Sequence, residues 1–410
     1  MKNLFQFILL SVIASSILLT QTKPGIEVLA ESNFKILQGK RVGLITNPTG
    51  ITSDYISTVD IFAKAKGVNL VALFGPEHGV RGDVTAGGKV DNFTDSTTGL
   101  PVYSLYGKTR KATPEMLRGI DVLVYDIQDI GSRSYTFINT MALAMEAAAE
   151  NNVEFIVLDR PNPLNGNRVE GNILDLKFKS FVGQYPIPYV YGMTCGELAE
   201  LLNNEGWLDG GKKCKLNVIK MENWKRWMHW DNTTLPWVLT SPHVPNSQTA
   251  LFYSAIGMLG ELETVNIGVG YTMPFQLVGQ EWINGAQLAD VLNAKKLPGV
   301  VFRPLSFKPY YGKQQGKQLS GVQIHIIDNA KINLTNIQLH VIETLIKLYP
   351  EKNPFSIADS DRNAMFDKVA GTDDVRKKLT DGVTASTIIT SWKNSIDEFM
   401  KVRKKYLLYE

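Results

Sequence analysis

Cysteine is scarce in this chain. Its 410 residues include only Cys195 and Cys214, and they contain no CxxC motif and no histidine-rich tract. A disulfide scaffold is therefore excluded, nothing suggests a structural zinc site, and the fold must be stabilised by packing. The two thiols either pair with each other or lie buried as small apolar side chains, and the sequence is compatible with both.

An excess of one charge is also missing. The chain has 43 Lys and Arg residues against 40 Asp and Glu residues, a formal net charge of +3. No segment concentrates basic residues as a nucleic-acid groove requires, so we expect no nucleic-acid partner. Hydrophobic residues make up 44% of the chain, which excludes disorder and allows a large core. A chain of this length forms two domains more often than one.

Long apolar runs are missing everywhere except near the N-terminus. Residues 4–19 (LFQFILLSVIASSILL) carry no charge and follow Lys2, and polar residues lead from there to Pro24-Gly25. This layout is typical of a signal peptide, so we assign residues 1–25 to export and expect a secreted, periplasmic or wall-associated protein. An uncleaved membrane anchor is the alternative, because the run approaches the length that crosses a bilayer.

From residue 41 onward, short apolar runs alternate with helical stretches. The expected strands are residues 42–46, 70–74, 102–105, 122–125, 155–158 and 216–221, and a helix is expected at 135–149. Apolar strands separated by helices indicate an α/β fold with a Rossmann-like, doubly wound, mostly parallel sheet. We place this domain at residues 36–250. Thr194 and Glu197 have the spacing of a capping box, and Gly206 is placed to end that helix.

The composition changes after a proline-rich stretch at residues 236–245. We expect a second, smaller α+β domain at residues 251–410. Its strongest elements are helices at 286–292, 336–348 and 388–407 and an alternating strand at 322–327.

Four of the expected strands end in polar, turn-rich loops, at residues 46–50, 75–82, 126–133 and 159–166. In an open parallel sheet, ligands bind beyond the carboxyl ends of the strands, where such loops meet. Motifs for several other chemistries are missing: the chain has no GxGxxG, GxxxxGK[ST], GxSxG or HExxH. We therefore expect neither a metal nor an organic cofactor.

A polar cleft with several carboxylates suits glycoside hydrolysis, which needs two groups across the scissile bond. Glu77 is the first catalytic candidate, because it follows an apolar strand and a proline. Asp126 and Asp159 are possible partners, since each stands where a strand gives way to its loop. Residues that would position a sugar are Asn47, His78, Arg81, Gln128, Asp129, Arg133, Tyr135 and Asn162.

Structural roles fit several of these residues equally well. Asp126 and Asp159 also suit loop caps that accept backbone N–H groups. Arg133 also suits a structural ion pair with Asp129 or Asp126. A single histidine such as His78 is weak evidence for a binding site.

The strand-end loops resemble one family, the NamZ-type exo-β-N-acetylmuramidases. The matching segments are GLITNPTG (43–50), LFGPEHGVRGD (73–83), LPVYSLYG (100–107), DVLVYDIQDIGSRSYT (121–136), LDRPNPLNG (158–166), VEG (169–171), GMTCGELA (192–199) and LPW…SPHVP (235–245). The resemblance covers most of the first domain and is weaker in the second.

The resemblance implies a Rossmann-like catalytic domain, a smaller C-terminal domain and an active cleft between them. It also implies release of terminal β-1,4-linked N-acetylmuramic acid from peptidoglycan fragments in cell-wall turnover. Muropeptides or MurNAc-GlcNAc oligosaccharides would then be the partners. The glutamate of the GPEHG motif, here Glu77, is the family's leading catalytic candidate. His243 and Tyr271 join the substrate-binding candidates.

One segment departs from the family pattern. Where the family usually has an arginine-containing SEGRGTTRPF-like segment, residues 266–275 read NIGVGYTMPF, with Val269 and Met273 at the arginine positions. A guanidinium would bind the lactyl carboxylate of muramic acid bidentately. Either Arg81 and Arg133 take over this role, or the substrate is a related amino sugar or a peptide-bearing fragment. A non-catalytic peptidoglycan-binding protein is the alternative function.

Overall fold

The computed structural model describes residues 21–82 and 93–410. Most of the expected signal peptide therefore lies outside the described residues. Within the described ranges, none of the helices combines the length and the apolar character needed to span a membrane. Cys195 and Cys214 are both buried and are not joined by a disulfide.

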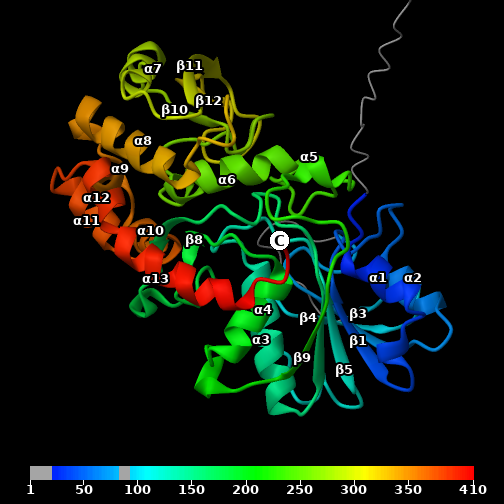
Figure 1. The fold of residues 1–410 in the computed structure, drawn as a ribbon. Helices are drawn as coiled ribbons and strands as arrows, with labels where there is room; N and C mark the ends of the chain where they lie inside the picture. Colours follow the sequence, from blue (N-terminus) through cyan, green and yellow to red (C-terminus); the bar gives the residue numbers. More distant parts are fainter. Residues whose placement is uncertain (1–20, 83–92) are drawn as a thin grey trace, which may run out of the picture.

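A seven-stranded sheet forms the centre of the N-terminal half of the described chain (Figure 1). In spatial order its strands are β3 (Phe93–Thr94), β4 (Pro101–Ser104), β2 (Asn69–Gly75), β1 (Arg41–Thr46), β5 (Val122–Asp126), β6 (Glu154–Leu158) and β9 (Lys215–Ile219). Neighbouring strands pair in parallel, except that β3 runs antiparallel to β4. The expected mostly parallel sheet is confirmed, and each strand predicted for this sheet begins and ends within two residues of an observed strand.

Helices cover both faces of this sheet (Figure 1). On one face, α1 (Gly25–Glu31) and α2 (Thr58–Lys64) pack against strand residues such as Leu44. On the other face, α3 (Phe137–Glu150) and α4 (Cys195–Asn204) pack against residues such as Ile45. Adjacent strand residues point to opposite faces of the sheet, so Leu44 packs in the core on one face and Ile45 in the core on the other. The doubly wound arrangement follows directly from these continuous apolar strands.

The predicted capping box at the start of α4 is confirmed. The Thr194 hydroxyl accepts a hydrogen bond from the Glu197 backbone N–H, and the Glu197 carboxylate accepts one from the Thr194 N–H. The helix ends at Asn204, and Gly206 follows with φ 68°. Because glycine adopts this left-handed conformation without strain, its place past the helix end matches the prediction.

The C-terminal half contains a smaller antiparallel sheet in the order β10 (Leu277–Gln280), β12 (Leu319–Ile326) and β11 (Val300–Phe307). Two short strands, β7 (Glu170–Ile173) and β8 (Pro188–Val190), pair separately. The helices are α5 (Trp230–Thr233), α6 (Ser247–Gly260), α7 (Gly285–Ala294), α8 (Leu334–Leu348), α9 (Pro354–Ile357), α10 (Ser360–Ala370), α11 (Asp374–Thr380), α12 (Ala385–Ser391) and α13 (Lys393–Arg403). The predicted division of the chain at residue 250 falls inside α6 and stays a prediction.

The prediction of one terminal helix at residues 388–407 is wrong. The helix is broken at Trp392, between α12 and α13, and α13 gives way to a short 3-10 turn at Lys404–Tyr406. The Ser391 hydroxyl donates to the Ile388 carbonyl at 2.6 Å. At the break the Trp392 N–H donates to the Ile389 carbonyl, three residues back, at 3.2 Å, so the backbone tightens there, which the charge pattern alone does not reveal. After the break, the chain returns to the central sheet beside α4 (Figure 1).

Candidate active site

Glu77 stands on a tight turn at the carboxyl end of β2. The turn is closed by a hydrogen bond from the Gly79 N–H to the Pro76 carbonyl at 3.0 Å. His78 and Gly79 both have left-handed backbone conformations, with φ of 74° and 75°. A non-glycine residue in this region is strained, and such strain concentrates at functional sites. The turn leaves Glu77 half-buried and His78 buried.

Side chains from two other strand-end segments contact Glu77. The Thr136 hydroxyl, after β5, donates to a Glu77 carboxylate oxygen at 3.4 Å. Tyr106, after β4, also hydrogen-bonds to Glu77. Burial, together with the charge and the hydrogen bond of Glu77, raises the pKa of Tyr106 to about 12. Burial also raises the pKa of Tyr135, and the charges of Asp129 and Glu77 add to that effect. Three strand-end segments therefore meet at Glu77, as expected for the edge of a parallel sheet.

Two histidines and a tyrosine extend this cluster toward the C-terminal half. Burial lowers the pKa of the His243 imidazole, and the nearby positive charge of His78 lowers it further. The His243 ring stacks on Tyr311, with centroids 6.1 Å apart and planes at 17°. Tyr271 stacks on the neighbouring Tyr310 at 5.6 Å. His78, Tyr135 and His243 thus gather with Glu77, and Tyr271 contacts the same C-terminal segment that reaches them.

Asp126 does not join this cluster. Its side chain has no exposed surface, and Arg160 binds both of its oxygens, at 2.5 and 2.9 Å. The Thr58 hydroxyl donates a third hydrogen bond at 2.5 Å. These partners occupy the carboxylate completely, so we assign Asp126 the structural role that its position also allowed.

Asp159 is equally enclosed. It has no exposed surface and accepts hydrogen bonds from the Thr194 hydroxyl at 2.7 Å, the Gly196 N–H at 2.8 Å and the Tyr409 hydroxyl at 2.5 Å. Burial raises the pKa of Asp159 to about 6, although these hydrogen bonds oppose the rise. The expectation that Asp126 or Asp159 faces Glu77 across an open cleft is therefore corrected, because both are sealed beneath the loops.

Four more candidates form the framework under the site. Asn47 accepts from the Thr49 N–H at 3.0 Å, and Asn162 donates to the Met193 carbonyl at 2.9 Å. Gln128 donates to the Pro161 carbonyl at 2.7 Å. Asp129 accepts from the Gly131 N–H and from the Tyr191 hydroxyl, and burial raises its pKa to about 6. All four are buried, so they hold the loops together rather than face a sugar.

The two arginines expected to bind a lactyl carboxylate are already engaged. Arg133 is 1% exposed and donates to backbone carbonyls on three segments, including Ile187 at 2.7 Å and Ala370 at 2.7 Å. Arg81 forms ion pairs with Asp95 at 3.1 Å and Asp60 at 3.3 Å. Arg133 is therefore a structural link to the end of α10, and Arg81 is a partly exposed member of an ion-pair network.

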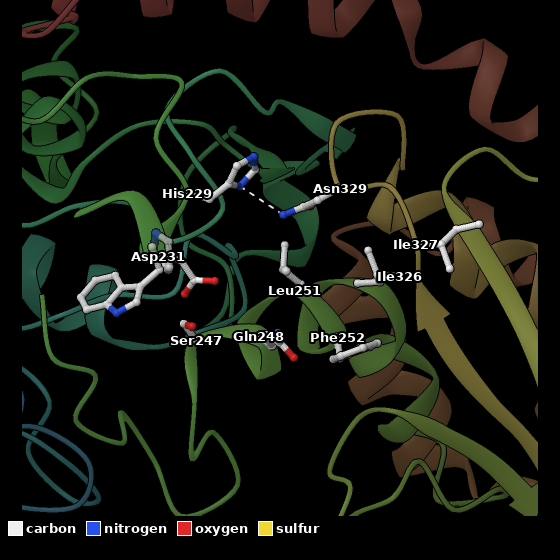
Figure 2. Close-up of a pocket in the computed structure, with 11 residues that line it drawn as sticks. His229, Asp231, Ser247, Gln248, Leu251, Phe252, Ile326, Ile327 and Asn329 are labelled. Carbon is white, nitrogen blue, oxygen red and sulfur yellow. Dashed lines mark hydrogen bonds between the residues drawn. The ribbon is translucent and has the colours of Figure 1, made fainter. Parts of the chain in front are cut away.

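Two cavities lie along α6. One, of about 310 Å³, opens at the start of the helix between Ser247, Asp231 and the end of β12, where Asn329 donates to His229 at 3.2 Å (Figure 2). The other, also about 310 Å³, lies further along the helix and is lined by Tyr253 and Glu261. Sequence reasoning missed both, because their residues come from segments far apart in the chain. In residues 21–82 and 93–410, no group of three or more His, Cys, Asp or Glu side chains is arranged to hold a metal ion.

Comparison with known proteins places the chain among wall-degrading enzymes. The family model described as exo-β-N-acetylmuramidase NamZ, N-terminal, matches residues 42–248, and its C-terminal counterpart matches residues 251–409. The peptidoglycan β-N-acetylmuramidase NamZ of Bacillus subtilis (strain 168) is 48% identical over 389 residues, which cover 95% of this chain and 92% of that protein.

Two crystal structures of DUF1343 family proteins from Bacteroides fragilis have the same fold. One has a TM-score of 0.91 at 54% identity, and the other has a TM-score of 0.77 at 32% identity. Each alignment covers 95% of this chain and 99% of the solved chain.

Proposed function

The chain belongs to the NamZ family of exo-β-N-acetylmuramidases, and on this premise we propose that Glu77 is the catalytic acid of a peptidoglycan hydrolase. The enzyme removes a terminal β-1,4-linked N-acetylmuramic acid, or a closely related amino sugar, from peptidoglycan fragments. Muropeptides and MurNAc-GlcNAc oligosaccharides are the substrates that this activity implies.

The position of Glu77 is the observation that carries the proposal. It is the one acidic candidate of the three that is only half-buried, and its described partners include the hydroxyls of Thr136 and Tyr106. Asp126 and Asp159, in contrast, have every oxygen engaged below the surface. A group that transfers a proton to a glycosidic oxygen must be within hydrogen-bond reach of the substrate.

In the proposed reaction, the protonated carboxyl of Glu77 gives its proton to the glycosidic oxygen as the C1–O bond breaks. The hydroxyl of a water molecule then bonds to C1, the remaining proton of that water restores the Glu77 carboxyl, and the departing fragment keeps the first proton on its new hydroxyl. Hydroxyl groups such as those of Thr136 and Tyr106 can hydrogen-bond to the carboxyl group in either protonation state, which suits a residue that gives up and regains a proton.

The test compares the full chain with its Glu77→Gln variant on a chromogenic β-N-acetylmuramide. We expect kcat to fall by about 10²- to 10⁴-fold, the usual contribution of a general acid, while the melting temperature stays unchanged. Glu281→Gln, at an exposed residue paired with Lys317, is the matched control and should keep full activity.

Equal rates for wild type and Glu77→Gln would remove Glu77 from catalysis. Mass spectrometry of sacculi incubated with the protein distinguishes the hydrolase from the alternative function, a wall-binding protein without activity. Binding to sacculi without release of a sugar would support a non-catalytic wall-binding protein, whereas a released monosaccharide supports the hydrolase.

Export completes the proposal. The substrate lies outside the cytoplasm, and residues 1–25 have the order of charged, apolar and polar segments typical of a signal peptide. N-terminal sequencing of the protein from the wall or culture fraction tests this. A mature chain that begins near residue 25 is expected, and an intact Met1 in the cytoplasm contradicts it.

A further inference from the structure

The cavity beside Tyr253 has the character of a sugar-binding site. It measures about 310 Å³ and lies between the second half of α6 and segments 265–269 and 312–314. Its apolar walls are Val265, Ile267, Val269 and Phe275. Pockets for small polar ligands typically combine such apolar and aromatic walls with a few placed polar groups. The polar residues of this cavity include two acids, Glu261 and Glu263.

Glu261 lacks the partners that other half-buried acids of this protein have. Among the described residues, no hydrogen bond or ion pair to its carboxylate is formed, although only part of the side chain is exposed. Glu263, two residues further on, pairs with Arg362 at 2.7 Å and Lys313 at 3.6 Å. Burial raises the pKa of Glu261; the charge of Arg362 opposes this and the charge of Glu263 adds to it. A partly desolvated carboxyl without a partner gains free energy when a ligand supplies one.

Two packed tyrosine rings lie between this cavity and the surroundings of Glu77. Tyr253, which lines the cavity, packs edge-on against Tyr135 with centroids 5.6 Å apart. The pKa of Tyr135 is raised in part by the charge of Glu77, and that of Tyr253 in part by the charge of Glu261. Each of these two packed rings therefore lies within the electrostatic influence of one of the two carboxyl groups.

A second connection runs through the segment that carries Tyr311. Tyr311 stacks on His243, which feels the charge of His78 beside Glu77. The next three residues, 312–314, line the cavity. Gly270 fixes this segment: its carbonyl accepts from the Tyr310 N–H at 2.7 Å, and a Cβ added to Gly270 would lie 2.3 Å from the Tyr311 carbonyl oxygen. Two parts of the cavity wall, Tyr253 and residues 312–314, are therefore each next to residues that interact with the surroundings of Glu77.

Resting on the proposed function, we infer that this cavity is the subsite that seats the terminal N-acylated amino sugar, and that Glu261 is a substrate-binding residue that hydrogen-bonds to that sugar. The apolar walls receive the acyl methyl group and one face of the ring. Glu261 pairs with a hydroxyl or amide N–H of the sugar. The scissile bond then faces the Tyr135 side, where Glu77 stands.

The test uses Glu261→Ala and Glu261→Gln in the full chain, with Glu281→Gln, at an exposed glutamate outside the cavity, as the matched control. On the chromogenic β-N-acetylmuramide, we expect Glu261→Ala to lower kcat/KM by about 10- to 100-fold, mainly through KM, as for a lost hydrogen bond to a charged or buried group. Glu261→Gln keeps a donor and an acceptor in the same place and should stay within about 5-fold of wild type. Glu281→Gln should resemble wild type, because Glu281 pairs with Lys317 on the surface and does not line the cavity.

Calorimetric titration with free N-acetylmuramic acid adds a readout that does not depend on turnover. We expect binding to wild type and to Glu77→Gln, and binding weakened by at least about 10-fold in Glu261→Ala. Unchanged KM and unchanged sugar binding in a folded Glu261→Ala variant overturn the inference. A Glu261→Gln variant as inactive as Glu77→Gln also overturns it, because the group would then transfer protons. If the wild type releases no sugar but binds it, and this binding is lost in Glu261→Ala, the subsite is supported and only the hydrolase proposal is rejected.

Discussion

Glu77 and Asp126 occupy comparable places in the same sheet but are held in opposite ways. Each stands at or just beyond the carboxyl end of a parallel strand, β2 or β5. Asp126 is fully buried, and the Arg160 guanidinium binds both of its oxygens. Glu77 is half-buried, and its partners include the hydroxyl groups of Thr136 and Tyr106. A guanidinium fixes a carboxylate in its ionised form, whereas hydroxyls tolerate both protonation states.

This difference shows that the sequence position of an acid at a strand end predicts where it lies but not whether its role is catalytic or structural. The partner decides the role. Asp126 with Arg160 ties the β5 loop to the β6 loop, and Asp159 ties β6 to α4 and to the C-terminal Tyr409. These buried links hold the edge of the sheet on which the Glu77 turn rests.

The largest expected effect concerns the buried ion pair. Asp126→Asn leaves the Arg160 guanidinium buried without its counter-charge, so we expect the free energy of unfolding to fall by about 3–5 kcal/mol. Urea denaturation measures this. The control is Asp121→Asn, which breaks the bidentate pair with Arg41 on the exposed surface and should cost at most about 1 kcal/mol.

Activity separates the two kinds of acid further. Well below the unfolding midpoint, Asp126→Asn should keep kcat within about 10-fold of wild type, whereas Glu77→Gln loses about 10²-fold or more. A stable but inactive Asp126→Asn variant would contradict the comparison, because it would return Asp126 to the chemistry.

Asp129 allows a pH test of buried carboxyls. Burial raises its pKa in the folded state to about 6, above the ordinary value of 3.8, so the folded protein holds this proton more tightly than the unfolded chain. The stabilisation is present below about pH 4 and is lost as the pH rises through about 6. Asp129→Asn cannot ionise, so its stability relative to wild type should improve by roughly 3 kcal/mol between pH 4 and pH 7.

Urea midpoints measured from pH 4 to pH 7 check this difference. The contribution of Asp121 to stability should change in the opposite direction and at lower pH. The hydrogen bonds from Arg41 lower the pKa of Asp121 to about 2, so this contribution is lost as the pH falls. A pH-independent difference between wild type and Asp129→Asn would show that the buried carboxyl titrates normally.

The sheet was predictable because its strands are buried on both faces. A run such as residues 42–46 has no polar interruption, and the helix at residues 137–150 between two such runs forces a parallel crossover. The helix cap was equally predictable, because a capping box requires only that Thr194 and Glu197 stand three residues apart in the sequence. The break at Trp392 was not predictable, because it is a local change of the backbone hydrogen bonding that the apolar period does not show.

The site was predictable only in part. The sequence placed Glu77, His78 and Tyr135 at strand ends, and in the structure Tyr135 feels the charge of Glu77, but their part in the chemistry stays a prediction. The buried partners of Asp126, Asp159 and Arg133 could not be read, since they lie between 34 and 250 residues away in the chain. Glu261 gave no sequence signal, because only tertiary packing shows that Glu263 has ion-pair partners whereas Glu261 has none in the described part of the chain.

The smallest expected effect tests the link from the sheet edge to the chain's end. The Tyr409 hydroxyl donates to Asp159 at 2.5 Å and accepts from the Met221 N–H at 3.0 Å. Tyr409→Phe leaves a buried acceptor and a donor short of a partner, so we expect it to cost about 1–2 kcal/mol of unfolding free energy without a change in KM. Tyr406→Phe, whose hydroxyl donates to the more exposed Glu205, should cost less than about 1 kcal/mol. Equal losses in the two variants would mean that enclosure of Asp159 does not depend on the terminal tyrosine.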